Sequence, residues 1–301
     1  MAERPFPPTA LPWGRHYAAV RPDHFSVAYE INPYMDIAVQ PDLELASRQW
    51  EGLVGLLGDL GARVEVLPQR PDSPDMVYAM NLGLALGGER SRVVMSHMRC
   101  PERRLETETA SRWFAAAGFD LSYVGQGAIG PHLEAGDAFP FAGSLVVGFG
   151  PRTDKLALKH LATELGVRVV GVEIVHPAMY HLDLAFCPLD DRSALVCLDA
   201  LGESSQAAML ALVPEPILIT EQEALTFCAN SVVVGRTIVM PACPDRVRGE
   251  LEAAGFEIVL IDVSEFHKAG GSIRCLTNPL DIELGRDLTR RLGGEVVLPA
   301  A

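Results

Sequence analysis

The chain has 301 residues, and 25 lysines and arginines against 39 aspartates and glutamates give it a net charge of −14 with histidine neutral. Apolar residues make up 49% of the chain and charged residues 21%, a balance typical of globular proteins that excludes an intrinsically disordered chain. An acidic chain without a basic run is a poor binder of nucleic acid, and its apolar stretches fall far short of the roughly 20 residues of a membrane span, so neither partner is expected.

Six stretches carry apolar residues at helical spacing, and each is followed by a short run typical of a strand. In the first, residues 42–60, apolar residues recur every three or four positions until Gly61 ends the pattern. The expected pairs of helix and strand are, in chain order, 42–60 with 63–67, 104–117 with 121–124, 154–165 with 167–175, 204–213 with 216–220, 244–254 with 257–263, and 282–292 with 295–298.

Between these pairs, five segments share a pattern of one polar residue, a short apolar run, a turn and often a second apolar run. They begin at Asn81, Asp137, Asp183, Asn230 and Cys275, and successive segments start 45 to 56 residues apart. No linker divides the chain, so we expect a single domain over residues 1–301, built as a ring of quasi-repeats. In a ring the five leading residues would converge; alternatively each of them simply begins a strand, as Asn and Asp often do.

The six cysteines include no pair separated by two residues, and nothing in the first twenty residues resembles a secretory signal. We therefore expect free thiols in a reducing cytoplasm, and most of them should pack as small hydrophobic residues. Cys275 differs from the rest. Gly270 and Gly271 would permit close approach of the backbone, and Lys268 and Arg274 would favour a thiolate.

Two acidic motifs are further candidates for chemistry. His181 and Asp183 are two residues apart, and in a strand their side chains would share one face, so that a carboxylate acts beside an imidazole. Half of a metal site is the alternative, but no second histidine pair or cysteine cluster completes one, so we expect no metal. Glu134 and Asp137 flank a glycine-containing turn that enters a strand.

These residues lie in motifs whose order resembles that of the guanidino-group-modifying enzymes, or penteins. The motifs are PDMVYAMN (74–81), ERRLE (102–106), EAGD (134–137), HLD (181–183) and KAGGSIRCLT (268–277), with INPYM (31–35) as a further match. The resemblance runs from about residue 23 to residue 278 and is strongest to the dimethylarginine dimethylaminohydrolase and arginine dihydrolase branch. It implies an α/β fold, the five-bladed α/β propeller.

The resemblance also implies roles for three residues. Cys275 would be the nucleophile, and His181 would act first as general acid and then as general base. Glu134 would hold the substrate's guanidinium group. Attack by the Cys275 thiolate would release ammonia or an alkylamine and leave a covalent thiouronium for water to open, so no cofactor is needed.

Five further residues match substrate-contacting positions of this family. Asp183 would contact the guanidino nitrogens, Asp75 and Asn81 match two contacts six residues apart, and Arg103 and Arg152 would hold an α-carboxylate. The expected partner is therefore a small molecule, arginine or a methylated arginine. Homo-oligomerisation stays open, and residues 12–36 are a candidate lid.

Asn81 indicates the product. Arginine dihydrolases resemble this chain in having Asn here, whereas citrulline-forming relatives have Asp, so we expect ornithine, carbon dioxide and ammonia. Ala135, Tyr78 and Met80 depart from the family's motifs. The alternatives are a dimethylarginine dimethylaminohydrolase or arginine deiminase that stops at citrulline, and an amidinotransferase in which an amine opens the thiouronium. A non-catalytic, ribosome-associated factor of this fold is disfavoured by the acidic charge and by the presence of Cys275.

Overall fold

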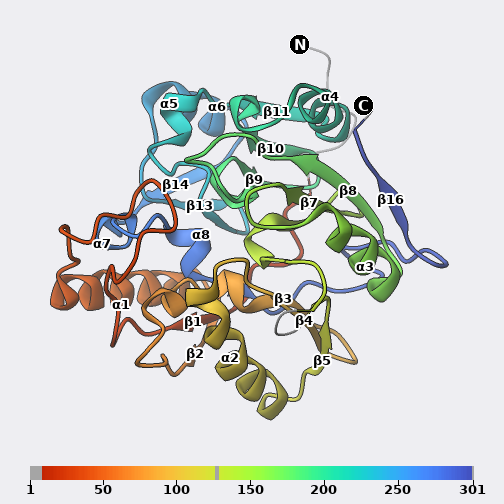
Figure 1. The fold of residues 1–301 in the computed structure, drawn as a ribbon. Helices are drawn as coiled ribbons and strands as arrows, with labels where there is room; N and C mark the ends of the chain where they lie inside the picture. Colours follow the sequence, from red (N-terminus) through yellow and green to blue (C-terminus); the bar gives the residue numbers. More distant parts are fainter. Residues whose placement is uncertain (1–8, 126–128, 300–301) are drawn as a thin grey trace.

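The computed structural model describes residues 9–125 and 129–299, and in this part of the chain five small β-sheets are arranged with helices around them (Figure 1). Four sheets repeat one plan, in which two strands form an antiparallel hairpin and a helix leads to a third strand parallel to the second. They are β3 (Gly83–Leu86), β4 (Arg92–Met95) and β5 (Asp120–Tyr123) with α2 (Arg104–Ala116); β6 (Ala138–Phe141), β7 (Ser144–Phe149) and β8 (Arg168–Glu173) with α3 (Lys155–Leu165); β9 (Phe186–Pro188), β10 (Ser193–Val196) and β11 (Glu215–Leu218) with α4 (Glu203–Leu212); and β12 (Val232–Val234), β13 (Thr237–Met240) and β14 (Glu257–Leu260) with α6 (Asp245–Ala253).

The fifth sheet is built from two distant parts of the chain. β15 (Asn278–Pro279) is antiparallel to β1 (His16–Val20), and β1 is parallel to β2 (Arg63–Leu67), which follows α1 (Leu43–Asp59). The hairpin expected to begin at Cys275 is therefore not closed by residues that follow it. β1 supplies its second strand, because β15 pairs with β1 at the start of the described chain.

The helix expected over residues 282–292 is absent, and that expectation is wrong. Gly285 has a φ of +89°, outside the helical region, and the Asp287 carboxylate accepts a hydrogen bond from the Glu283 backbone N–H at 2.7 Å, which stabilises a turn. The strand expected after it does form. It is β16 (Glu295–Val297), a fourth strand that lies parallel to β8 at the edge of its sheet.

α1 shows why the other expected helices form. The Asp42 side chain accepts hydrogen bonds from two backbone N–H groups of the first turn and so caps the helix, and Gly61, with a φ of +86°, follows its end. The spacing of apolar residues gives the helix one buried face, which comprises Ala46, Trp50, Leu53 and Leu57.

Short turns carry or precede the leading polar residues of the repeats. They are the 3₁₀ turns Ala79–Leu82, Ala135–Asp137 and Leu182–Leu184 and the single-turn helix α8 (Ile273–Leu276); α5 (Glu221–Ala224) and α7 (Ser264–His267) are also short. In Figure 1, α8 lies near the middle of the view, with α1, α2, α3, α4 and α6 towards the periphery. Among the described residues, no helix combines the length and the apolar character needed to cross a membrane.

Candidate active site

The leading polar residues of the repeats meet through hydrogen bonds between neighbouring turns. Asn81 Oδ1 accepts from the Gly136 N–H at 2.9 Å, and Asp137 Oδ1 accepts from the Leu182 N–H at 2.9 Å. Asn230 Nδ2 then donates to the Asp183 carbonyl oxygen at 3.0 Å. The structure therefore places residues that are far apart in sequence around one buried region.

Cys275 lies in α8 with its side chain almost completely buried. Its Sγ is 3.1 Å from Asn230 Nδ2 and 3.2 Å from Asp183 Oδ2, so the thiol donates to the carboxylate and accepts from the amide. Burial raises the thiol pKa well above its ordinary value, and the Asp183 charge raises it further. In this arrangement the sulfur is a neutral thiol at neutral pH.

The two cations expected to favour the thiolate do not determine its pKa. Lys268 Nζ lies 2.6 Å from Glu265 Oε2 and is paired there. The Arg274 guanidinium lies over the Phe139 ring, 5.0 Å from its centroid, and Nη1 donates to the Thr277 carbonyl oxygen. The pKa of the Cys275 thiol goes up instead, because burial and Asp183 outweigh any nearby positive charge.

The two glycines before Cys275 have the expected role. Gly270 has a φ of +87°, and a Cβ added to Gly271 would overlap the Tyr78 ring. Tyr180 donates its hydroxyl hydrogen to the Gly270 carbonyl oxygen at 2.7 Å. The backbone that leads into α8 is thus packed directly against two aromatic side chains.

His181 and Glu134 form a buried pair. His181 Nε2 is 2.8 Å from Glu134 Oε2, and Glu134 Oε1 accepts from the Arg99 N–H at 3.0 Å. Burial works to raise the pKa of Glu134, but the charge of Arg152, the hydrogen bond from His181 and the charge of Arg103 outweigh it and hold that pKa well below its usual range. Glu134 is therefore an ionised acceptor, which assigns the proton to Nε2 and leaves His181 Nδ1 for other partners.

A closed cavity of about 10 Å³ lies between these groups. Its lining residues are Ile31, Asn32, Asp75, Tyr78, Asn81, Arg103, Arg152, Tyr180, His181, Ala269, Gly271 and Cys275. A volume this small holds one water molecule at most, so an amino-acid ligand enters only if part of the wall moves. Ile31 and Asn32 belong to the segment expected as a lid, and Asn32 Nδ2 donates to the Ala269 carbonyl oxygen at 3.0 Å.

The cavity wall includes six of the eight residues singled out for catalysis or substrate binding. Glu134 and Asp183 stand outside the wall, and each contacts a residue on it, namely His181 and Cys275. Glu134 is placed to orient His181, and its role in holding a guanidinium group stays a prediction. The six residues on the wall are Asp75, Asn81, Arg103, Arg152, His181 and Cys275.

The acidic residues near the cavity are strongly affected by burial. Burial raises the pKa of Asp75 to about 6 although the Arg103 charge lowers it, and burial raises the pKa of Asp183 as well. Within the described part of the chain, Asp75 Oδ1 and Asp183 Oδ1 are buried without a hydrogen-bond partner. Two carboxylates with unused acceptor oxygens favour a cationic ligand.

The two arginines differ in how they are held. Arg103 donates from Nε and Nη2 to both carboxylate oxygens of Glu106 at 2.8 Å, and from Nη2 to the Asp75 carbonyl oxygen at 3.2 Å. Arg152 donates from Nη2 to the Ile31 carbonyl oxygen at 2.7 Å and lies over the Tyr180 ring. Arg152 is thus bound to the candidate lid.

Two residues at this site were not among the residues expected to carry chemistry. Asn230 contacts the Cys275 sulfur, and Glu106 fixes Arg103. Asn230 is the first residue of one of the five repeated segments, and this position, equivalent to that of Cys275, is the signal that could have identified it. Glu106 ends the ERRLE motif, but nothing in the sequence distinguishes a buried glutamate from an exposed one on a helix.

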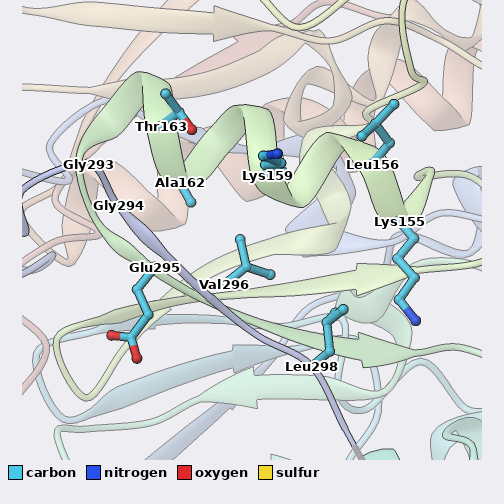
Figure 2. A pocket seen from close by; sticks show the side chains of 10 residues that line it. All are labelled: Lys155, Leu156, Lys159, Ala162, Thr163, Gly293, Gly294, Glu295, Val296 and Leu298. Carbon is cyan, nitrogen blue, oxygen red and sulfur yellow. The ribbon is translucent and has the colours of Figure 1, made fainter. Parts of the chain in front are cut away.

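A larger groove lies away from these residues. Its volume is about 610 Å³, and α3 and the segment that contains β16 border it (Figure 2). Lys155, Leu156 and Lys159 of α3 line one side, and Val296 and Leu298 line the other. It contains none of the candidate catalytic or substrate-binding residues.

Comparison with known proteins gives one consistent result. A family model described as "N,N dimethylarginine dimethylhydrolase, eukaryotic" matches residues 21–282. An N(G),N(G)-dimethylarginine dimethylaminohydrolase of Mycobacterium tuberculosis is 34% identical over 274 residues, which cover 90% of this chain and 87% of the relative.

Arginine dihydrolases are similar as well. The bifunctional arginine dihydrolase/ornithine cyclodeaminase AgrE of a Nostoc species is 31% identical over 261 residues, and the chain spans only 36% of its length. The structure of unliganded AgrE superimposes with a TM-score of 0.84 over 89% of this chain and 39% of AgrE. The substrate-bound N-terminal domain of ArgZ, a cyanobacterial arginine dihydrolase, superimposes with a TM-score of 0.83 at 30% identity, over 89% of this chain and 98% of that domain.

Proposed function

The chain belongs to the dimethylarginine dimethylaminohydrolase family of guanidino-modifying hydrolases, and on that premise we propose that it hydrolyses arginine through Cys275, and does so through to ornithine. The observation that carries the proposal is the arrangement around one closed cavity, with the Cys275 sulfur 3.2 Å from a buried carboxylate and the His181–Glu134 pair beside it. A thiol, a proton carrier and carboxylates for a planar cation are the groups that guanidinium hydrolysis requires.

Substrate binding would itself create the nucleophile. In the closed site, burial and Asp183 keep the Cys275 thiol neutral, and burial raises the pKa of Asp75. A bound guanidinium cation reverses the sign of the local charge, which favours both ionised carboxylates and the thiolate. We place the guanidinium between Asp75 and Asp183, whose free carboxylate oxygens support this position.

The reaction then runs in two halves. The Cys275 thiol passes its proton to His181 Nδ1, and the resulting thiolate attacks the guanidino carbon to form an S–C bond; the C–N bond then breaks as His181 gives that proton to the departing nitrogen. In the second half a water molecule attacks the thiouronium carbon, His181 accepts a proton from that water, and the S–C bond breaks to release the ureido product. Glu134 supports both halves, because its carboxylate binds His181 Nε2 and so orients the ring.

The α-carboxylate of the substrate would bind the two arginines. Arg152 would exchange its hydrogen bond to the Ile31 carbonyl oxygen for the substrate carboxylate, which couples binding to movement of the lid. Arg103 contributes from the cavity wall with Nη1, since Nε and Nη2 are engaged by Glu106. This arrangement favours arginine over agmatine, which has no α-carboxylate.

Asn81 supports ornithine as the product. Its Oδ1 accepts a hydrogen bond from the Gly136 N–H, so the side-chain NH₂ group is left as a donor on the cavity wall. That donor suits the neutral ureido oxygen of citrulline and would retain it for a second attack. Release at citrulline, as in a dimethylarginine dimethylaminohydrolase or an arginine deiminase, is the alternative that the family also supports, and amidino transfer to an amine is another.

We also propose that the five sheets close into a single propeller domain that acts in the cytoplasm. The hydrogen bonds from Asn81 to Gly136, from Asp137 to Leu182 and from Asn230 to Asp183 and Cys275 support closure. The sheet shared by β1 and β15 supports it too, because it joins the first and last repeats. The free thiols suit a reducing compartment.

Product analysis tests the function directly. Purified enzyme is incubated separately with arginine, monomethylarginine, dimethylarginine and agmatine, and products are measured by amino-acid analysis and ammonia release. We expect two equivalents of ammonia per ornithine from arginine. Cys275→Ser should abolish turnover with unchanged thermal unfolding, whereas Cys228→Ser, at a buried thiol outside the cavity, should retain it. Substantial turnover by Cys275→Ser would refute the proposal.

A further inference from the structure

Asn230 is held in one orientation by four hydrogen bonds. Its backbone N–H donates to the Phe227 carbonyl oxygen at 2.9 Å, and its backbone carbonyl accepts from the Arg274 N–H at 3.1 Å. Its side-chain Oδ1 accepts from the Cys275 N–H at 3.2 Å, and Nδ2 donates to the Asp183 carbonyl oxygen at 3.0 Å. The side chain is fully buried, so no solvent competes for these contacts.

These partners decide which side of the amide faces the sulfur. A backbone N–H can only donate and a backbone carbonyl can only accept, so Oδ1 must face the Cys275 N–H and Nδ2 must face Asp183. The second hydrogen of Nδ2 is then available to the Cys275 sulfur, 3.1 Å away. A flipped amide would lose both backbone bonds and leave the sulfur without this donor.

The other charged groups around the sulfur act in opposite directions: Arg274 is coupled to Cys275 by charge, with its contacts to Thr277 and Phe139, whereas a carboxylate lies directly against the sulfur. Asp183 Oδ2, at 3.2 Å, opposes a negative charge on sulfur. The titratable or charged side chains around Cys275 are Asp183, His181, Arg274, Tyr34, Tyr78 and Tyr180. Of these side chains, only Asp183 has a hydrogen bond to the sulfur in the described structure. Two hydrogen-bonding groups lower the thiol pKa, the Ser272 backbone and the Asn230 amide, and of the two Asn230 is the side chain.

We propose that Asn230 is a thiolate-stabilising residue whose Nδ2–H donates to the Cys275 sulfur and offsets the adjacent carboxylate, so that the sulfur ionises once the substrate cation is bound. The inference rests on the proposed role of Cys275 and adds a residue to it. A hydrogen bond to the charged form of an acid favours that form, and a buried bond is worth more than an exposed one. The same amide also aims the sulfur, because it binds the Cys275 backbone and side chain together.

The test measures ionisation of Cys275 rather than turnover. The rate at which iodoacetamide alkylates Cys275 is followed by peptide mass spectrometry as a function of pH in wild type, Asn230→Ala and Asn230→Asp. Loss of the donor should move the midpoint of the alkylation profile up by about one pH unit or more in Asn230→Ala, and further in Asn230→Asp. An unchanged midpoint in either folded variant overturns the proposal.

Asn278→Ala is the matched control. Asn278 is also buried, and its Nδ2 donates to two groups as that of Asn230 does, but both are backbone carbonyls, of Ala79 and Gly83, and neither is the sulfur. Its alkylation midpoint should match that of wild type. An equal shift in Asn278→Ala would mean that any lost core amide disturbs Cys275, which overturns the specific role of Asn230.

A measurement on the unmodified side chain covers the case in which Asn230 variants fail to fold. In ¹⁵N-labelled wild-type protein, the side-chain NH₂ resonances of Asn230 should shift with the same pH midpoint as Cys275 alkylation, and Cys275→Ser should abolish that shift. Resonances that do not respond to this titration refute the donor. Because neither measurement needs turnover, an inactive Cys275→Ser supports the proposed function whichever way the Asn230 result falls.

Discussion

Cys275 has surroundings that keep its thiol protonated while the site is empty. Burial and the Asp183 carboxylate both raise its pKa, and the cavity beside it holds one water molecule at most until part of its wall moves. In the proposed mechanism, the reactivity of this thiol depends on the substrate cation, on Asn230 and on opening of the wall. A thiol that ionises only with substrate bound is protected from oxidation between turnovers, since the thiolate is the reactive form.

Asn81→Asp should shift the product of arginine from ornithine towards citrulline. The carboxylate would still accept from the Gly136 N–H, but it would replace the free NH₂ donor on the cavity wall by a negative charge. That charge favours the cationic substrate and disfavours the neutral ureido group, so that citrulline leaves before a second attack. Amino-acid analysis after full consumption of arginine measures the ratio. Citrulline as the end product of wild type would remove the basis for this role.

Single residues were predictable from the sequence only where a motif marks them. Cys275, His181 and Asp183 lie in short motifs that occur in a fixed order, so the sequence alone identifies them as candidates. The environment that sets their chemistry could not be read in this way. Arg274 is adjacent to Cys275 in sequence, but its guanidinium group lies over the Phe139 ring. Asn230, 45 residues from Cys275, reaches the sulfur.

At the scale of elements, the connections between repeats carry the site. The Asp137 carboxylate links its own turn to two other connecting segments. Its Oδ1 accepts from the Leu182 N–H at 2.9 Å, and its Oδ2 accepts from the Thr153 hydroxyl at 2.6 Å. Arg152 connects a different pair of segments, the body of the protein and the candidate lid at Ile31. Each contact gives a test of one connection.

Asp137→Asn should flatten the pH dependence of stability. Burial raises the pKa of Asp137 to about 7, whereas in the unfolded chain it titrates near 4, so the folded state holds a proton that the unfolded state releases. The stability linked to this group is therefore full below about pH 4 and is lost as the pH rises to about 7. Replacement by Asn removes this loss, which is on the order of a few kcal/mol.

The measurement is urea unfolding between pH 4.5 and 8. Asp75 and Glu106 also have raised pKa values, so the difference between Asp137→Asn and wild type isolates the contribution of Asp137. Asp59→Asn, at an exposed carboxyl at the end of α1, is the control and should follow wild type. If Asp137→Asn and wild type keep parallel curves over this range, Asp137 is not the titrating group.

Arg152→Lys should weaken binding of arginine much more than binding of agmatine. A bidentate bond to an α-carboxylate requires the planar guanidinium, which lysine cannot reproduce. We expect the KM for arginine to rise at least about tenfold, with a smaller change for agmatine, which lacks the carboxylate. Steady-state kinetics on both substrates decides it. Equal effects on the two would mean that Arg152 acts only through the lid or through Glu134.

Elements were predictable where local signals determine them. The helices α1, α2, α3, α4 and α6 lie within one residue of the stretches where apolar spacing placed them, because that spacing gives each helix a buried face. The expectation failed at residues 282–292, where Leu288 and Ile282 are buried without helical geometry and Gly285 turns the chain. It also missed the pairing of β15 with β1, which no local pattern records.

For the whole molecule, the site depends on distant parts of the chain being joined. Cys275 lies in α8, immediately before β15, and β15 is held by β1 near the start of the described chain. The Leu280 N–H donates to the His16 carbonyl oxygen at 2.8 Å, which extends that contact. By contrast, β16 is an edge strand, mostly half-buried, and it contributes no residue to the cavity.

Removing the two ends should therefore have opposite results. Deletion of residues 1–20 removes β1, which leaves β2 and β15 without a partner and frees the segment that follows α8, so we expect loss of cooperative unfolding and of activity. Deletion of residues 293–301 removes β16 alone, so we expect a folded enzyme with turnover within about threefold of wild type and a Tm lower by several degrees. Thermal unfolding by circular dichroism and arginine consumption measure both. Comparable loss of folding in the two deletions would show that closure through β1 and β15 is not what holds Cys275 in place.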